Sequence, residues 1–178
     1  MESFHRQSEG THIKPPFRAK LQPVSPFRMT STQPYQGHFD GPRHHFAVRV
    51  YFEDTDFSGV VYHARYLHFM ERARSDMLAC VGIDQRSVHA DGQGAYAVTE
   101  MHMKYRRPAH FDDALVVVST VEAVRAASCV IHQKVLRGDE ILTEAQVTAA
   151  FVSPEGKARR QPATWVAAFQ PIIHRPAE

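Results

Sequence analysis

One segment with helical periodicity, at about 63–81, stands in a chain whose other regular segments alternate as strands. Its apolar residues recur every three or four positions and fall on one face: Tyr66, Phe69, Met70, Ala73, Met77, Cys80 and Val81. Gly82 follows directly, at the position where glycine commonly ends a helix. A helix with a single apolar face has to bury that face against another layer, so this segment constrains the fold more than any other.

The strand-like segments supply that layer. Alternating apolar and polar residues predict strands at about 45–53, 95–106, 114–124, 128–136 and 140–152. In the last of these, one face is predicted to carry Ile141, Thr143, Ala145, Val147, Ala149 and Phe151. One long helix with about five antiparallel strands is an α+β arrangement. Since one helix covers only one face of such a sheet, we also expect a homo-oligomer.

The two ends of the chain differ from this middle part. Residues 1–43 contain six of the 11 prolines and no lasting periodicity, which predicts a disordered, proline-rich N-terminal arm. The folded domain is expected at 44–160, and 161–178 is expected to be a C-terminal tail with a short helix or hook at about 164–169. The arm carries six basic and three acidic residues, so the small net charge of +2 gives no argument for nucleic-acid binding.

Other features of the composition indicate the compartment. The two cysteines form no C-x-x-C pair, which favours reduced core residues over a disulfide or a metal site. No apolar run approaches the roughly 20 residues of a membrane span, and the N-terminus lacks the apolar centre of a signal peptide. We therefore expect a cytoplasmic protein without a membrane span.

Chemistry is suggested by the loop before the helix, where Glu53, Asp54 and Asp56 precede Gly59. A loop carboxylate can act as a nucleophile or a base, and the free N–H groups of a helix start can hold a developing negative oxygen. The pattern D-x-D-x-S-G also suggests a calcium loop. However, position 12 of that loop is Arg65 instead of the bidentate Glu that calcium requires. No H-x-x-x-H or H-E-x-x-H motif occurs either, so we expect no metal.

Two stretches resemble a known family. They are Y-F-E-D-T-D-F-S-G-V-V-Y-H-A-R-Y-L-H-F-M-E-R-A-R at 51–74, and Y-R-R-P-A-H-F-D-D-A-L at 105–115. Both are similar to hot-dog-fold acyl-CoA thioesterases of the 4-hydroxybenzoyl-CoA thioesterase class, above all to the short-chain acyl-CoA thioesterases associated with the bacterial Tol-Pal system. The resemblance covers roughly 44–160. It implies a hot-dog domain in which the sheet wraps the helix.

The resemblance also implies roles for individual residues. Asp56 corresponds to the catalytic carboxylate, as nucleophile or general base, and His63 to the residue whose backbone N–H binds the thioester oxygen. Substrate-binding positions are Gly59, Val60, Val61, Tyr62 and Glu71, of which Glu71 is also the second choice for the catalytic carboxylate. Tyr66 is expected to pack in the core. No residue is assigned to coenzyme A itself.

The implied reaction is hydrolysis of a short-chain or aromatic acyl-CoA to the free acid and coenzyme A, with no cofactor. Expected partners are the acyl-CoA, a second copy of the chain in a homodimer or homotetramer, and an acyl carrier protein as an alternative source of the thioester. Two other hypotheses stay open at this point. One is an acyl dehydratase of similar shape, and the other is a non-catalytic acyl-CoA or acyl-carrier binding module of an envelope complex.

Overall fold

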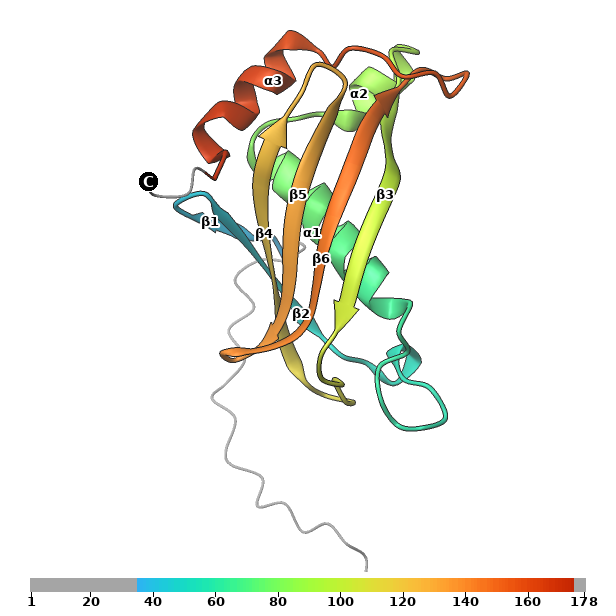
Figure 1. Ribbon diagram of the computed structural model, residues 1–178, viewed down its shortest axis with the longest axis vertical. Helices are drawn as coiled ribbons and strands as arrows, with labels where there is room; N and C mark the ends of the chain where they lie inside the picture. Colours follow the sequence, from blue (N-terminus) through green and yellow to red (C-terminus); the bar gives the residue numbers. More distant parts are fainter. Residues whose placement is uncertain (1–34, 175–178) are drawn as a thin grey trace, which may run out of the picture. The chain divides into compact units, whose positions relative to one another are not determined.

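The computed structural model describes residues 35–174, so residues 1–34 of the arm predicted at 1–43, and the last four residues of the chain, lie outside the described part. The described chain forms one sheet with a long helix, α1, against one of its faces (Figure 1). The elements in chain order are β1 (His38–Asp40), β2 (Arg43–Arg49), the 3-10 helix η1 (Phe52–Asp54), α1 (Arg65–Cys80), α2 (Gln85–Ala90), β3 (Ala95–Tyr105), β4 (Ala114–Val124), β5 (Ser128–Arg137), β6 (Glu140–Val152), α3 (Ala163–Phe169) and the 3-10 helix η2 (Gln170–Ile172).

The sheet has six strands in the order β1-β2-β4-β5-β6-β3, and every neighbouring pair is antiparallel. The α+β class and the hot-dog arrangement are therefore confirmed, whereas the prediction of five strands is wrong by one. The additional strand, β1, lies in the segment predicted to be disordered. Gly41, with φ +55°, turns the chain so that β1 pairs with β2, and this brings 35–43 into the folded part.

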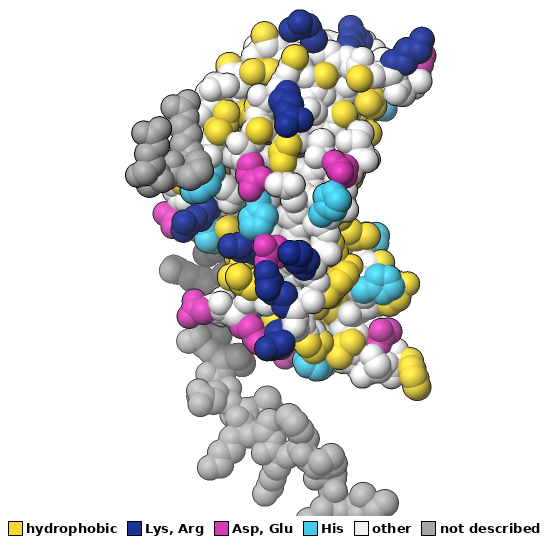
Figure 2. All heavy atoms as spheres, in the orientation of Figure 1, with side chains coloured by type: hydrophobic (Ala, Val, Ile, Leu, Met, Phe, Trp, Pro, Cys, Tyr) yellow, Lys and Arg dark blue, Asp and Glu magenta, His cyan; other side chains and the backbone are white. Residues whose placement is uncertain are grey.

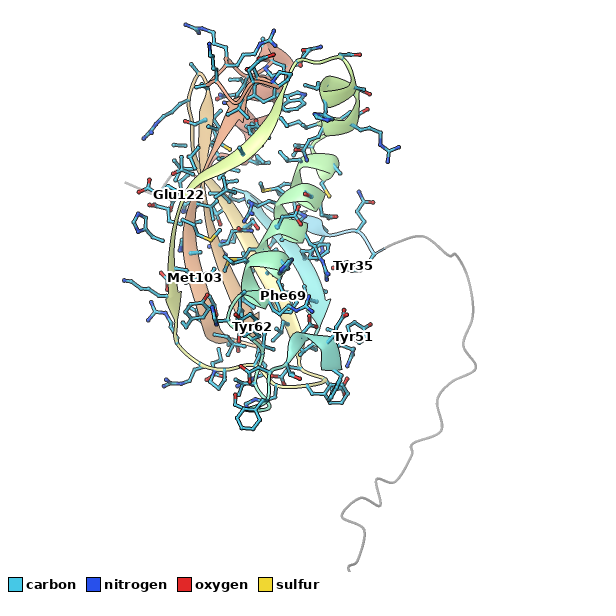
Figure 3. All side chains as sticks on the ribbon, turned by 90° about the vertical axis from the view of Figure 1, so that its right-hand side faces the viewer. Tyr35, Tyr51, Tyr62, Phe69, Met103 and Glu122 are labelled. Carbon is cyan, nitrogen blue, oxygen red and sulfur yellow. The ribbon has the colours of Figure 1, made fainter. Side chains whose placement is uncertain are left out.

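The core lies between α1 and the sheet and consists of two clusters. The first surrounds Phe69 and Met70 of α1 and includes Leu115, Val117 and Val147 of the strands; Phe69 is labelled in Figure 3. Tyr66 is 2% exposed, so its predicted core position is confirmed. The fold of the first half of α1 is thus fixed by apolar burial on one helix face.

The second cluster extends the folded part past residue 160. It joins Met77 of α1 and Phe151 of β6 to Trp165 and Phe169 of α3, all of them buried. The expected short C-terminal helix is confirmed, but it is an integral part of the core and not a free tail. The aromatic side chains on its buried face explain this, because Trp165 packs on Phe151 at a ring-centroid distance of 5.5 Å.

Three local differences from the sequence prediction have physical causes. The strand expected at 45–53 ends at Arg49, since the chain turns into η1 at Phe52. In β6, Leu142 is buried while Ile141 is only half-buried, because the register with β5 shifts there and reverses the alternation. Helix α2 is too short for a periodicity signal, although Asp84 caps it by accepting a hydrogen bond from the Ser87 N–H.

The face of the sheet that points away from α1 carries both polar and apolar side chains. Charged and histidine side chains gather over its strands (Figure 2), among them Glu122, which is labelled in Figure 3, and the pair His132 and Glu144, 3.6 Å apart. The described residues contain no helix of the length and hydrophobicity needed to cross a membrane.

Candidate functional site

The acidic loop is a tight hairpin whose tip is 56–60. Thr55 pairs with Val61 across its base, the Asp56 N–H donates to the Val60 carbonyl at 2.9 Å, and the Gly59 N–H donates to the Asp56 carbonyl at 3.0 Å. Gly59 has φ +79°, a conformation that favours glycine. The glycine of the motif therefore closes the turn that presents Asp56.

Asp56 stands exposed at this tip. Its Oδ1 atom accepts hydrogen bonds from the Ser58 N–H at 2.8 Å and from the Ser58 hydroxyl at 2.5 Å. These bonds from Ser58 lower the pKa of Asp56, so the carboxylate is ionised at neutral pH. Within residues 35–174, the second oxygen, Oδ2, has no hydrogen-bond partner. One oxygen thus fixes the orientation of the carboxylate while the other faces solvent.

Asp54, two residues earlier, has the opposite surroundings. Its side chain is 5% exposed, its Oδ2 accepts the Tyr51 N–H at 2.8 Å, and its Oδ1 lies 3.6 Å from Nε of Arg65. Its carbonyl also accepts the Tyr62 N–H at 2.9 Å. Asp54 consequently connects the base of the hairpin to the start of α1. The first carboxylate of the calcium-like pattern is paired with the Arg65 side chain.

His63 lies just before α1 and is exposed. Its carbonyl accepts the Tyr105 hydroxyl at 3.1 Å, and its ring lies against Tyr62 at a centroid distance of 4.4 Å. In the described part of the chain no group accepts the His63 backbone N–H. This N–H is therefore available to an oxygen from outside the chain.

The second sequence motif holds the first in place. The Val61 N–H donates to the Ala109 carbonyl at 2.8 Å, and the Ala109 N–H donates to the buried Tyr66 hydroxyl at 3.0 Å. Val60 pairs with His110, whose own N–H donates to the Asp113 carboxylate at 2.8 Å. The two stretches noticed in the sequence thus form one hydrogen-bonded unit beside the start of α1.

Five of the seven sequence-predicted site residues line three separate hollows in the described part of the chain, and Val60 and Tyr62 line none of these three. Asp56 and Gly59 line a depression of about 560 Å³, together with the exposed rings of Phe52, Phe57 and Phe111. Val61 and His63 line a second one of about 300 Å³, whose other walls are Tyr66, Tyr105, Arg106, Arg107 and Pro108. Asp56 and His63 therefore line different hollows of the single chain.

Glu71 and Tyr62 are placed differently from the rest. Glu71 lines a separate cavity of about 120 Å³ beside Arg74, and its carboxylate accepts the Ser75 hydroxyl at 2.7 Å. It shares neither hollow with Asp56 or His63. Tyr62 is 46% exposed and lies between the hairpin and α1 (Figure 3).

Sequence reasoning missed Tyr105, the residue that fixes the His63 carbonyl. Its ring also lies 5.8 Å from that of Tyr66, so it forms one wall of the His63 hollow. The available signal was its position as the first residue of the second motif, at the end of a strand just before Arg106, Arg107 and Pro108.

Comparison with known proteins places these features in a wider group. The model of the thioesterase superfamily matches residues 58–144. The acyl-CoA thioesterase YbgC of Haemophilus influenzae is 42% identical over 107 residues, which are 60% of this chain and 79% of the relative. The acyl-CoA thioester hydrolase YbgC of Escherichia coli O6:H1 is 39% identical over 125 residues, 69% of this chain and 92% of the relative.

A solved structure agrees with these relatives. The crystal structure of a probable thioesterase from Bartonella henselae is 40% identical in sequence, with a TM-score of 0.64. The match covers 67% of this chain and 99% of that one.

Proposed function

Because the chain belongs to the thioesterase superfamily and is an acyl-CoA thioesterase with the hot-dog fold, we propose that Asp56 is its catalytic carboxylate. The observation that carries this proposal is the state of the carboxylate. It is exposed and held through Oδ1 by Ser58, and within residues 35–174 its Oδ2 has no hydrogen-bond partner. A group that is oriented and still unpaired is suited to attack or to proton abstraction.

In the general-base form of the reaction, Oδ2 takes a proton from water while the water oxygen attacks the thioester carbonyl carbon. The carbonyl oxygen becomes negatively charged, and we assign its stabilisation to the His63 backbone N–H, not to the imidazole. Collapse of this intermediate breaks the C–S bond and releases coenzyme A as a thiolate, which then gains a proton. The products are the free acid and coenzyme A.

In the nucleophilic form, Oδ2 itself attacks the carbonyl carbon and the C–S bond breaks, leaving a mixed anhydride that water hydrolyses. Both forms need the same ionised carboxylate and the same N–H donor. Neither calls on a metal or a cofactor, since the thioester is already activated.

The neighbouring residues shape the approach of the substrate. We propose that Gly59 presents backbone to the thioester, because it is exposed at the turn and carries no side chain. We propose that Val60 and Val61 act beside it by holding this turn in place, since their backbone groups bond to Asp56 and Ala109 and Val61 lines the His63 hollow. Tyr62 offers an exposed ring to the acyl group or the pantetheine arm. Glu71 is proposed as a more distant substrate contact, in view of its place in the separate cavity beside Arg74.

We further propose that two copies pair through β3. This strand bonds to β6 on one side only, and among residues 35–174 no strand covers its other edge. An edge of 11 residues that also exposes Val98 is a natural site for pairing. Such a homodimer, alone or as half of a tetramer, would place the 54–62 hairpin of each copy near the other copy.

The substrate source and the compartment also belong to this proposal. We propose acyl-CoA as the physiological substrate, with an acyl carrier protein as the alternative donor of the thioester. A cytoplasmic location is supported by the two cysteines, Cys80 and Cys129, which are both free thiols.

The experiment is steady-state release of free thiol from a panel of short-chain and aromatic acyl-CoAs. The wild type is compared with Asp56→Asn and with Asp112→Asn. Asp112 is a matched control, because it is an exposed aspartate on a nearby loop whose partner is Arg49 at 2.7 Å. We expect loss of about 10²–10⁴-fold in kcat/KM for the first variant and little change for the second. Equal activity in all three proteins would overturn the assignment of Asp56.

A further inference from the structure

Three side chains of metal-ligand type meet at the far end of α1, away from the hairpin. Asp76 and Cys80 are four residues apart and so share one face of α1, and His44 reaches them from β2. The His44 side chain is fully buried and that of Asp76 is 12% exposed. No residue of this cluster lines the hollows of Asp56 and His63.

The distances between their ligand atoms are those of a tetrahedral metal site. His44 Nε2 lies 3.3 Å from Asp76 Oδ1 and 3.9 Å from Cys80 Sγ, and Sγ lies 3.7 Å from Oδ1. A tetrahedral zinc ion with bonds of about 2.0–2.1 Å to N and O and about 2.3 Å to S holds such atoms about 3.3–3.6 Å apart. The three atoms therefore need to move by only a few tenths of an ångström to bind one ion.

We propose that His44, Asp76 and Cys80 form a binding site for a single Zn²⁺ ion. The donor set selects the metal, because thiolate and imidazole suit zinc, whereas calcium and magnesium require several oxygen ligands. On binding, the Cys80 S–H bond breaks, the sulfur forms a bond to zinc, and the proton leaves to solvent. Water fills the fourth position, since Asp76 and Cys80 both reach the surface.

A second layer of contacts orients the carboxylate. The Gly37 N–H donates to both oxygens of Asp76, at 2.7 and 3.1 Å. A side chain at position 37 would meet His44 Nε2 at 2.7 Å and Asp76 Oδ1 at 2.9 Å, so glycine leaves the space that the cluster occupies. Such outer contacts commonly set the geometry of a ligand.

The surroundings of His44 limit the affinity of the cluster for zinc. Its other ring nitrogen, Nδ1, is buried and has no hydrogen-bond partner among the described residues. Zinc at Nε2 requires the proton on Nδ1, where it would find no acceptor. We therefore expect weaker binding than in a closed site with four protein ligands. The ion would fasten the β1–β2 hairpin to α1 and thereby raise the thermal stability of the protein.

The test is titration of the full-length chain with Co²⁺, which replaces zinc and is visible in the optical spectrum. One equivalent should give ligand-field bands of a four-coordinate ion and a thiolate-to-cobalt charge-transfer band, and Zn²⁺ should displace both. Cys80→Ser should lose the charge-transfer band. Cys129→Ser should keep it, since Cys129 is a buried thiol outside the cluster.

The two other ligands are tested by affinity. His44→Gln and Asp76→Asn should each weaken zinc binding by about 100-fold or more, measured by competition with a chromophoric chelator. His102→Gln, on an exposed histidine of β3, should leave it unchanged. The rise in Tm on adding Zn²⁺ should disappear in Cys80→Ser even if that variant is itself less stable. Absence of the cobalt–thiolate band in the wild type, or its survival in Cys80→Ser, would overturn the proposal.

Discussion

The base and the tip of the 54–62 hairpin carry the same carboxylate in opposite states. At the base, Asp54 is buried and its two oxygens face the Tyr51 N–H and Arg65. At the tip, Asp56 is exposed and only one of its oxygens is bound, to Ser58. We propose that these two residues of the same type, two positions apart, serve the fold and the reaction separately.

The difference arises from the local backbone. The 3-10 turn η1 directs Asp54 back onto the N–H group of Tyr51, three residues earlier. The turn closed by Gly59 then reverses the chain and leaves Asp56 at the outermost point. A buried, fully bonded carboxylate stabilises a structure, whereas a carboxylate with a free oxygen retains its capacity to react.

After the loss expected for Asp56→Asn, the largest effect is expected from moving the carboxylate at the tip without removing it. Asp56→Glu keeps the negative charge but moves the carboxylate oxygens outward by one methylene, away from the position in which the hydrogen bonds from Ser58 hold them. We expect kcat/KM to fall by about 10–100-fold, because small displacements of a catalytic group are costly. Thiol release measures the activity of the variant, and urea unfolding measures its stability. A rate close to that of the wild type would mean that the exact position of the carboxylate at the tip is unimportant.

Removing the carboxylate at the base should affect stability instead. Asp54→Ala removes the acceptor of the part-buried Tyr51 N–H and the buried carboxylate beside Arg65, so we expect a loss of about 1–3 kcal/mol in the free energy of unfolding. Glu53→Ala is the matched control on the adjacent exposed residue, with an expected change within about 0.5 kcal/mol. Equal stability of the two variants in urea would remove the distinction between base and tip.

A smaller loss is expected where the second motif supports the base. Tyr66→Phe removes the hydroxyl that accepts the Ala109 N–H and leaves the ring in the core. We expect a decrease of about 1 kcal/mol in the free energy of unfolding, the usual value of one hydrogen bond. Tyr62→Phe, on an exposed tyrosine, should change it much less. If the two variants lose the same free energy of unfolding, the hydrogen bond between Tyr66 and Ala109 contributes nothing to stability.

The smallest effect is a shift in pH dependence at the tip. Ser58 lowers the pKa of Asp56, and the proposed mechanism needs the ionised form, so we expect activity to fall as the pH drops through this pKa. Ser58→Ala removes the hydroxyl donor, raises the pKa, and moves the acid limb of kcat/KM to higher pH with little change at neutral pH. Ser153→Ala, which loses a similar bond to Glu155, is the control and should leave the limb in place. A shift to lower pH would contradict the assigned role.

Much of the fold followed from the sequence, because long periodic segments report burial directly. The α1 face from Tyr66 to Met77 and the limits of β4 and β6 were predicted in this way. The misses are features that periodicity does not encode. The register shift that buries Leu142 depends on the partner strand, and the pairing of β1 depends on the turn at Gly41.

The site was less predictable. The motif located the loop, and resemblance selected Asp56, but the residues alone did not separate Asp54 from Asp56. That separation depends on the hydrogen bonds made by η1 and on the salt bridge between Asp54 and Arg65. Arg65 also donates a hydrogen bond at 2.8 Å to the carbonyl of Glu53, twelve positions earlier in the chain. The same applies to Tyr105, whose contact with the His63 carbonyl joins segments 42 residues apart.

The most direct test is a single-turnover measurement of thiol release with saturating enzyme, wild type against Asp56→Asn. This isolates the chemical step from binding and product release. We predict that the variant still binds the acyl-CoA and unfolds at the same urea concentration, while the rate constant for thiol release falls by at least about 100-fold. A single-turnover rate constant within about twofold of the wild type would contradict the account, and the catalytic carboxylate would have to be sought elsewhere, first at Glu71.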